Sequence, residues 1–252
     1  MPASPAVDSR VSSVSVIVPA FNEEQGIAAS LRSIRHAMTA CDAAGWTSEL
    51  IVCDNHSTDR TAEIAREAGA LVVFEPVNQI SRARNAGAAQ ARGDWLLFVD
   101  ADSHPTRELF AEVMDLMQGG RCVAGGSTVR FEHPARIVAC IGGCWNRISR
   151  ITRWAAGSFI FCDASAFREI GGFSLELYAA EEIDLCRKLK RLARRTGRTI
   201  QILHRHPLLT SSRKARLYTV REAVTFVFRT VMQRGRTLRS ADECFQWYDG
   251  RR

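Results

Sequence analysis

The first half of the chain repeats one pattern four times: a short, nearly all-apolar run is followed by a segment with helical periodicity. The apolar runs lie at 14–19, 49–53, 70–74 and 95–99, and the helical segments at 25–40, 59–68, 81–92 and 106–118. Strands that are apolar on both faces are typical of a parallel sheet covered by helices on both sides. The pattern therefore predicts an α/β protein with a mostly parallel, Rossmann-like central sheet flanked by helices.

The second half is less regular. Its apolar runs predict strands at 121–131, 157–162 and 199–203 and helices at 180–196 and near 219–233. The sequence contains no internal repeat and no low-complexity linker. We therefore predict a flexible tail (1–12), a single α/β domain (13–215) and a C-terminal helical extension (216–252).

Composition narrows the choice of partners. The 252 residues carry a net charge of +7 and have a pI near 9.2, which favours anionic partners such as nucleotides, phosphates or an acidic membrane surface. The eight cysteines are scattered and lack zinc-site spacing, so we interpret them as reduced core thiols. The first ten residues lack the apolar segment of a secretory signal, and no stretch approaches the roughly 20 apolar residues of a spanning helix. We therefore expect a cytoplasmic protein.

Acidic residues follow three of the predicted strands. Glu23 follows the first, Asp54 follows the second, and Asp100 and Asp102 follow the fourth. Because the carboxyl ends of parallel strands form one edge of the sheet, these loops should converge on one ligand site. Two carboxylates separated by one residue suit a hard divalent cation, Mg²⁺ or Mn²⁺, that also binds phosphate oxygens. The alternative is that Asp102 or Ser103 caps the next helix.

Four segments then occur in a specific order: "VSVIVPAFNEEQGI" (14–27), "ELIVCDNHSTDRTAEIA" (49–65), "NQISRARNAGAAQARGDWLLFVDAD" (78–102) and "GSFIFCDASAFREIGGFSLELYAAEEIDLCRKL" (157–189). Together they resemble the family 2 glycosyltransferases of the GT-A fold, over roughly residues 14–190. The resemblance implies an inverting, metal-assisted transfer of one sugar from a UDP- or GDP-linked donor to an acceptor hydroxyl. Residues 13–118 would then be the nucleotide-sugar-binding half, and residues 119–215 the acceptor and catalytic half.

The resemblance also implies which residues contact the nucleotide. Pro19, Phe21 and Glu23 match the family's first loop, which lies along the nucleoside. Asp54 matches the aspartate that pairs with the base. Arg84 matches the start of a helix that approaches the nucleotide, and an arginine there suits a phosphate or a base edge. The alternative for Arg84 is a solvated charge on a helix.

The diphosphate and the cation have their own candidates. By the same resemblance, Asp100 matches the ribose-side acid of the Asp-x-Asp motif and Asp102 matches the direct metal ligand. Some GT-A enzymes use a late histidine as a third ligand, which would be His206 or His204 here, although lone histidines are more often surface residues. Arg213 could meet the diphosphate.

The pair Glu181-Glu182 matches the family's late acid pair, which supplies the general base. An inverting transfer needs a carboxylate that removes the proton of the attacking hydroxyl. We favour Glu182 as this base, with Glu181 as the alternative. The competing interpretation is that both glutamates only compensate the dipole at the start of a helix.

Departures from the family pattern bear on the substrate. The second motif reads Asp54-Asn55-His56-Ser57 where Asp-Asp-Gly-Ser is common, which leaves the base open. The Gln-x-x-Arg-Trp signature of processive synthases is missing, so a single transfer is favoured. The acceptor, whether a sugar, a lipid-linked molecule or a small molecule, is not identified, and no nucleic acid is expected. The alternative functions are a non-catalytic nucleotide- or polyanion-binding protein and a nucleotidyltransferase.

Two segments suggest further contacts. The stretch 135–156 mixes arginines with apolar residues, and we interpret it as a mobile acceptor loop that packs on the core. Its alternative is a peripheral element on an anionic bilayer that carries a lipid acceptor. The amphipathic helix near 219–233 is interpreted as core or homodimer packing.

Overall fold

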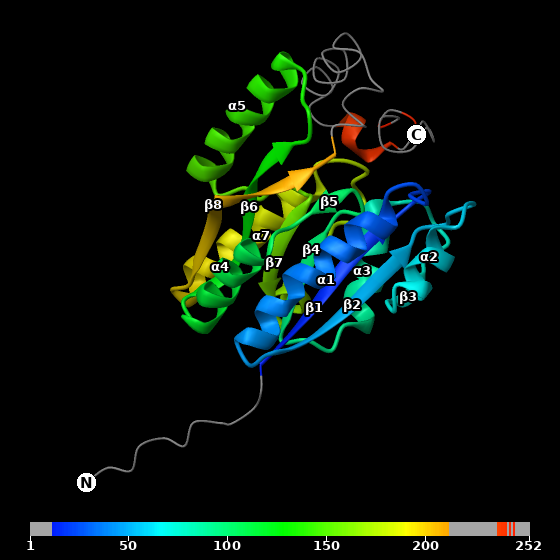
Figure 1. The fold of residues 1–252 in the computed structure, drawn as a ribbon. Coiled ribbons are helices and arrows are strands. Elements are labelled where there is room, and N and C mark those ends of the chain that lie inside the picture. Colours follow the sequence, from blue (N-terminus) through cyan, green and yellow to red (C-terminus); the bar gives the residue numbers. More distant parts are fainter. Residues whose placement is uncertain (1–11, 212–235, 241, 243, 245–252) are drawn as a thin grey trace.

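A computed structural model describes residues 12–211, 236–240, 242 and 244 (Figure 1). Its centre is an eight-stranded sheet with the order β3-β2-β1-β4-β7-β6-β8-β5. The strands are β1 (Ser13–Ala20), β2 (Thr47–Asp54), β3 (Leu71–Phe74), β4 (Trp95–Val99), β5 (Ser103–His104), β6 (Cys122–Phe131), β7 (Phe159–Asp163) and β8 (Thr199–Thr210). The helices are α1 (Ile27–Ala43), α2 (Thr61–Glu67), α3 (Ile80–Gln90), α4 (Arg107–Gln118), α5 (Arg136–Thr152), α6 (Ala164–Glu169), α7 (Glu181–Thr196) and the short 3₁₀ helix η1 (Arg236–Arg239).

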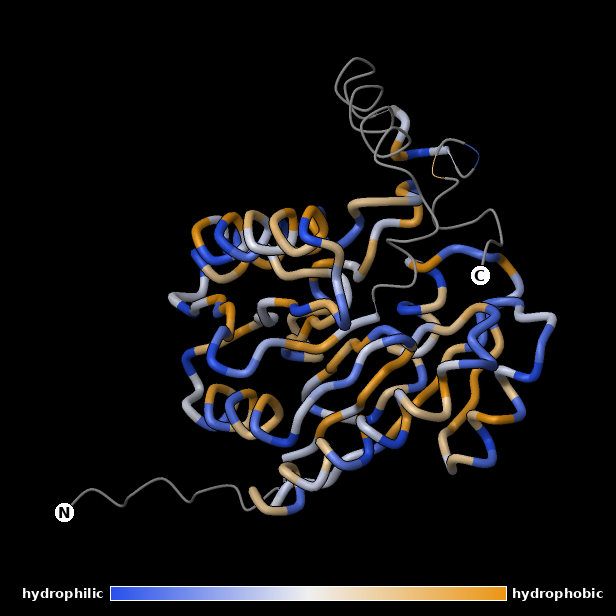
Figure 2. The backbone as a smooth tube through the Cα atoms, turned by 45° about the horizontal axis from the view of Figure 1, so that its top comes forward, coloured by the Kyte–Doolittle hydropathy of each residue, from blue (hydrophilic) through white to orange (hydrophobic). Residues whose placement is uncertain are grey.

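The first half forms the parallel βα arrangement that the apolar runs predict. Strand β1 pairs in parallel with β2 and β4, and β2 pairs in parallel with β3. One face of these strands packs with α1 and α4, whereas the other packs with α3, α6 and α7. Within β1, Val16 faces the first layer and Ile17 faces the second. Both faces are therefore buried, which explains why the central strands are almost continuously hydrophobic (Figure 2).

The second half introduces antiparallel pairing. Strand β7 runs antiparallel to both β4 and β6, while β6 and β8 are parallel and β5 pairs antiparallel with β8. The reversed direction of β7 brings its beginning to the edge where β4 ends, and the Asp100 N–H donates to the Ser158 carbonyl at 3.2 Å. The sheet is therefore mostly parallel, as predicted, and its reversed strand adds residues to the predicted ligand edge.

Two expectations for the second half are wrong. The stretch 135–156 is not a loop, because residues 136–152 form α5. The side-chain amide of Asn146 holds this helix on β6 through hydrogen bonds to the backbone N–H and C=O of Val129, at 3.0 and 2.9 Å. Strand β8 extends through Thr210 instead of ending near residue 203, with a register shift opposite residues 203–208.

Three further predictions from the sequence concern the helix near 219–233, the cysteines and membrane-spanning helices. The predicted helix near 219–233 lies outside the described residues. The eight cysteines are free thiols; six are buried, but Cys140 and Cys144 are exposed on α5. Across the described residues, no helix combines the length and the apolar composition needed to cross a membrane.

Candidate active site

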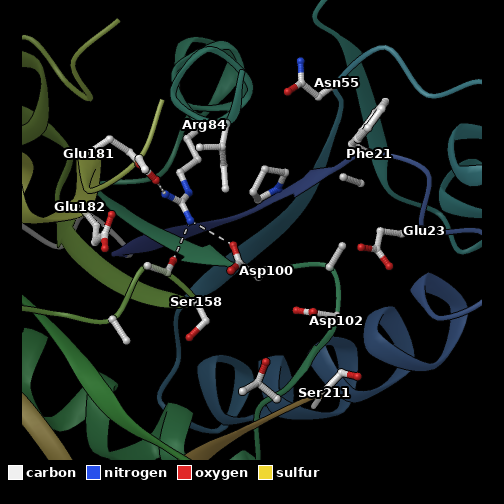
Figure 3. Close-up of a pocket in the computed structure, with 18 of the residues that line it drawn as sticks. Phe21, Glu23, Asn55, Arg84, Asp100, Asp102, Ser158, Glu181, Glu182 and Ser211 are labelled. Carbon is white, nitrogen blue, oxygen red and sulfur yellow. Dashed lines mark hydrogen bonds and ion pairs between the residues drawn. The ribbon is translucent and has the colours of Figure 1, made fainter. Parts of the chain in front are cut away.

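A cavity of about 470 Å³ lies at the carboxyl ends of β1, β2 and β4 (Figure 3). Strands β6 and β8, helices α5 and α7 and the segment before β7 complete its wall. Most of the residues that the sequence suggests for the site line it: Pro19, Phe21, Glu23, Arg84, Asp100, Asp102, Glu181 and Glu182. Segments separated by more than 150 residues thus meet in one place.

The loop after β1 is fixed by hydrogen bonds to the loop after β2. Asn22 adopts a left-handed backbone conformation, with a φ of 50°. Its side-chain oxygen accepts from the Thr58 N–H at 2.8 Å, and its own N–H donates to the Ser57 hydroxyl at 3.0 Å. The Glu23 N–H donates to the Thr61 hydroxyl at 2.7 Å. This bracing holds Phe21 and Glu23 at the cavity wall.

The Asp-x-Asp loop is held at both ends by the strands beside it. Besides the bond from Asp100 to Ser158, the Ser211 N–H donates to the Asp102 carbonyl at 3.1 Å. Helix α4 is capped by Thr106, whose hydroxyl accepts from the Leu109 N–H at 3.2 Å. The alternative in which Asp102 or Ser103 caps this helix is therefore wrong, and the Asp102 side chain lines the cavity (Figure 3).

Arg84 connects the acids at the back of the cavity. Its guanidinium, only 1% exposed, donates to Asp100 at 3.0 Å, to Glu181 at 2.7 Å and to the Gly157 carbonyl at 2.8 Å (Figure 3). Burial lowers the pKa of Arg84, but Asp100 and Glu181 outweigh it, so that the pKa lies above its ordinary value. The solvated-charge alternative is wrong. We interpret Arg84 first as a positioning residue, and its contact with a nucleotide stays a prediction.

The late acid pair begins helix α7. Burial raises the pKa of Glu181 despite the opposing effect of the Arg84 guanidinium. Burial and the neighbouring Glu181 carboxylate raise the pKa of Glu182 to about 8. A carboxyl with such a pKa in a cavity is a candidate for proton transfer near neutral pH.

Other predicted residues lie away from the cavity wall. His206 does not line the cavity, and its Nδ1 lies 2.9 Å from the Glu112 carboxylate on α4, so its role as a metal ligand stays a prediction. His204 is exposed on β8. Asp54 is buried and accepts a hydrogen bond from the Ser57 N–H at 3.1 Å, so its contact with a base stays a prediction. Arg213 lies outside the described residues.

Several cavity residues were not suggested by the sequence. Asn55, Ser158, Trp145 and Thr210 also line it. A signal existed for Asn55, which directly follows Asp54 at the end of a predicted strand. The others required knowledge of the reversed β7, the helix α5 and the long β8.

The acid pair fits a divalent cation. Mg²⁺ and Mn²⁺ accept one or two carboxylates and complete their coordination with water and substrate phosphates. Asp100 and Asp102 supply this kind of donor at the wall of the cavity. No cluster of three or more His, Cys, Asp or Glu side chains suited to a metal occurs in the part of the chain that the structure describes. A cation held by these two carboxylates would complete its coordination with water and substrate phosphate oxygens.

Apolar parallel strands and an acidic cavity at their carboxyl ends define an α/β protein with a candidate ligand site at one edge of its sheet. Comparison with known families gives the assignment. Residues 15–169 match the model of glycosyl transferase family 2, and the chain belongs to this family.

Two of the matching relatives are longer proteins. The undecaprenyl-phosphate 4-deoxy-4-formamido-L-arabinose transferase of Edwardsiella ictaluri is 32% identical over 126 residues, which cover 47% of this chain and 37% of the relative. Glycosyltransferase AglE of Haloferax volcanii is 32% identical over 127 residues, covering 48% of this chain and 40% of AglE. The matched region is thus about two fifths of these relatives.

Solved structures confirm the fold. S. aureus TarS 1–349 superposes with a TM-score of 0.61 at 20% identity, covering 85% of this chain and 64% of that one. Glucosyl-3-phosphoglycerate synthase from Mycobacterium tuberculosis, in complex with Mn²⁺, UDP and phosphoglyceric acid, superposes with a TM-score of 0.57 at 21% identity, covering 88% and 76%. At such identities the likeness establishes the GT-A architecture.

Proposed function

We propose that this protein is an inverting glycosyltransferase that moves a single sugar from a UDP- or GDP-sugar to an acceptor hydroxyl. One observation carries the proposal: Asp100, Asp102, Glu181 and Glu182 meet at one cavity around a buried arginine. Related structures add support, since TarS has been solved with UDP-GlcNAc and the mycobacterial synthase with Mn²⁺ and UDP. The location in the cytoplasm stays a prediction.

The donor occupies the side of the cavity formed by the first half of the chain. Pro19, Phe21 and Glu23 lie along the nucleoside, with Asn55 beside them. Asp100 and Asp102 would hold Mn²⁺ or Mg²⁺, and the cation would also bind oxygens of the diphosphate. When bound, the cation stabilises the negative charge of the leaving diphosphate, so no protein acid is needed for that group.

Glu182 acts as the general base. The acceptor oxygen attacks the anomeric carbon, the bond from that carbon to the diphosphate oxygen breaks, and the hydroxyl proton passes to the Glu182 carboxylate. Glu181 is less suited to this role because it accepts a hydrogen bond from Arg84 at 2.7 Å. Both glutamates line the cavity, and of the two it is Glu181 that bonds to the guanidinium.

The experiment measures release of UDP or GDP from a panel of nucleotide sugars, with candidate acceptors and Mn²⁺. We expect release with the matching donor and acceptor, and its loss in EDTA. Asp102→Asn should abolish it, because the cation loses a carboxylate ligand. Arg60→Gln, at an exposed ion pair with Glu63, is the control for a surface substitution. Selective nucleotide binding without turnover for any donor and acceptor would support the non-catalytic alternative instead.

A further inference from the structure

The outer face of helix α5 carries a stripe of exposed apolar side chains. Four isoleucines on it are unusually exposed: Ile137 by 50%, Ile141 by 61%, Ile148 by 45% and Ile151 by 84%. At about 100° per residue they lie within an arc of about 80°, together with Cys144. The helix lies at the margin of the molecule, and hydrophobic and hydrophilic residues alternate along it (Figures 1 and 2).

The opposite face of α5 already has its partners. Asn146 is hydrogen-bonded to Val129 of β6, and Trp145 lines the cavity. Gly142 lies so close to Phe131 that a Cβ there would be 3.1 Å from the ring. The helix is therefore anchored through one face, and the isoleucine stripe is not needed for that anchoring.

Basic residues border the stripe. Arg136, Arg147 and Arg150 lie along one side of it, and the sequence from 136 to 153 contains no acidic residue. Such an arrangement of apolar and cationic side chains on a helix is typical of segments that lie in the interface of an anionic membrane.

Helix α7 adds cations at the end of α5. Lys190 donates to the Thr152 carbonyl, and the charges of Arg187 and Lys190 lie 5.5 and 5.4 Å from the centre of the Trp154 ring. Burial lowers the pKa of Lys190, and repulsion from Arg194, Arg153 and Arg187 adds to this effect. Several cations therefore lie close together near the C-terminal end of α5.

We propose that the outer face of α5 docks on an anionic lipid bilayer, with the isoleucines in the interface and the arginines at the lipid phosphates. A second copy is a poorer partner, because a two-fold contact along this helix would bring two rows of arginines together. The docking goes beyond the proposed transfer reaction. Because Trp145 of the same helix lines the cavity, the docked face of α5 would lie close to the cavity.

The test is flotation of the full chain with vesicles of phosphatidylcholine containing 30% phosphatidylglycerol, compared with pure phosphatidylcholine. We expect binding to the anionic vesicles, and a loss of at least about tenfold in the partition coefficient for Ile141→Glu/Ile148→Glu. Arg147→Glu/Arg150→Glu should weaken binding by at least about tenfold, since each cation near the surface contributes. All four side chains are exposed, so folding should persist, as circular dichroism would verify.

Matched controls separate this surface from bulk properties of the chain. Leu71→Glu/Phe74→Glu makes the same kind of change at apolar residues that are 51% and 61% exposed on β3. Arg32→Glu/Arg66→Glu makes the same change in net charge at exposed positions on α1 and α2. Both controls should bind like the unaltered chain. Equal losses in the controls and the α5 variants would overturn the proposal.

Cys144 gives a second readout that needs no variant of the stripe. With Cys140 replaced by serine, Cys144 is the exposed thiol among the described cysteines and can carry an environment-sensitive fluorophore. We expect its emission to shift to the blue on adding anionic vesicles. If the emission is already blue without vesicles and stays blue on dilution, the chain itself covers the stripe. If that blue emission disappears on dilution, a second copy covers it. Either result would overturn the proposal. Neither experiment uses a donor, so its failure is distinct from failure of the proposed transfer.

Discussion

Arg84 brings together residues that are far apart in the sequence. It lies in α3 and pairs with Asp100 after β4 and with Glu181 at the start of α7. A buried ion pair is tolerated when each charge has hydrogen-bonded partners, and removal of one partner leaves the others uncompensated. The positions of both acids therefore depend on this single side chain.

Replacing Arg84 should destabilise the whole protein. We expect Arg84→Met to lower the free energy of unfolding by about 3–5 kcal/mol, because the buried Glu181 and the partly buried Asp100 lose their counter-charge. Urea denaturation measures the change. Arg60→Met removes one side of an exposed pair with Glu63 and should leave the urea midpoint nearly unchanged. Similar midpoints for the two variants would contradict the role given to Arg84.

Glu182 should make turnover depend on pH. A base must be deprotonated, so the rate should rise with pH through the pKa of Glu182, which is about 8 in the protein without ligands. Glu182→Gln should reduce transfer by at least about 100-fold while nucleotide binding survives. Steady-state rates from pH 5 to 9 and a binding titration of the nucleotide measure both effects. Normal transfer by Glu182→Gln would remove Glu182 from the mechanism.

The same pKa predicts how stability changes. Because the folded state raises the pKa of Glu182 from its ordinary value of 4.5 to about 8, it binds a proton that the unfolded chain releases between these values. This group's contribution to stability is therefore fully present below about 4.5 and falls as pH rises towards 8. Urea denaturation at several pH values should show a flatter dependence for Glu182→Gln than for the unaltered chain.

At the scale of elements, local pattern predicted the first half well and the second half less well. Strand β4 lies at residues 95–99 as predicted, because five consecutive apolar residues are bounded by Asp94 and Asp100. Helix α5 was missed because Gly142 and Gly143 lower helix propensity, and contacts with β6 outweigh that cost. The direction of β7 depends on pairing with β4 and β6, and no local signal encodes it.

Two glycines should respond oppositely to alanine. A Cβ at Gly125 in β6 would clash with the Gln201 carbonyl oxygen and the Phe161 ring, so Gly125→Ala should lower stability by about 1–3 kcal/mol. A Cβ at Gly143 in α5 would meet nothing within 4 Å. Gly143→Ala should raise stability by about 0.5–1 kcal/mol through helix propensity. Chemical denaturation measures both, and equal effects would contradict the packing of β6.

At the scale of the whole molecule, the sequence predicted those residues of the candidate site that directly follow a parallel strand. Asp100, Asp102 and Glu23 line the cavity because parallel strands end at one edge. The acid pair at 181–182 was placed by resemblance, since nothing local connects α7 to that edge. The sequence did not indicate the contact of His206 with Glu112 of α4, because tertiary packing brings these residues together.

Ligand binding should stabilise the molecule only when the cation is present. At about 100 times the dissociation constant, a nucleoside diphosphate with Mn²⁺ contributes about 2.7 kcal/mol, which corresponds to a rise in Tm of about 5–10 °C. We expect this rise for the unaltered chain and for Glu182→Gln, and its loss in Asp102→Asn or in EDTA. Differential scanning fluorimetry provides the measurement. An equal rise without any divalent cation would exclude the assigned role of Asp102.

The reversed strand β7 has a consequence for how this architecture can diversify. After Asp102 the backbone forms β5, α4, β6 and α5, and it returns just before β7 to the place where β4 ends. The chain between Asp102 and β7 therefore begins and ends at almost the same place. Replacing residues 132–156 with the corresponding segment of another family member need not move the carboxylates of Asp100 and Asp102. Chimaeras made at these boundaries offer a route to new acceptors on an unchanged donor site.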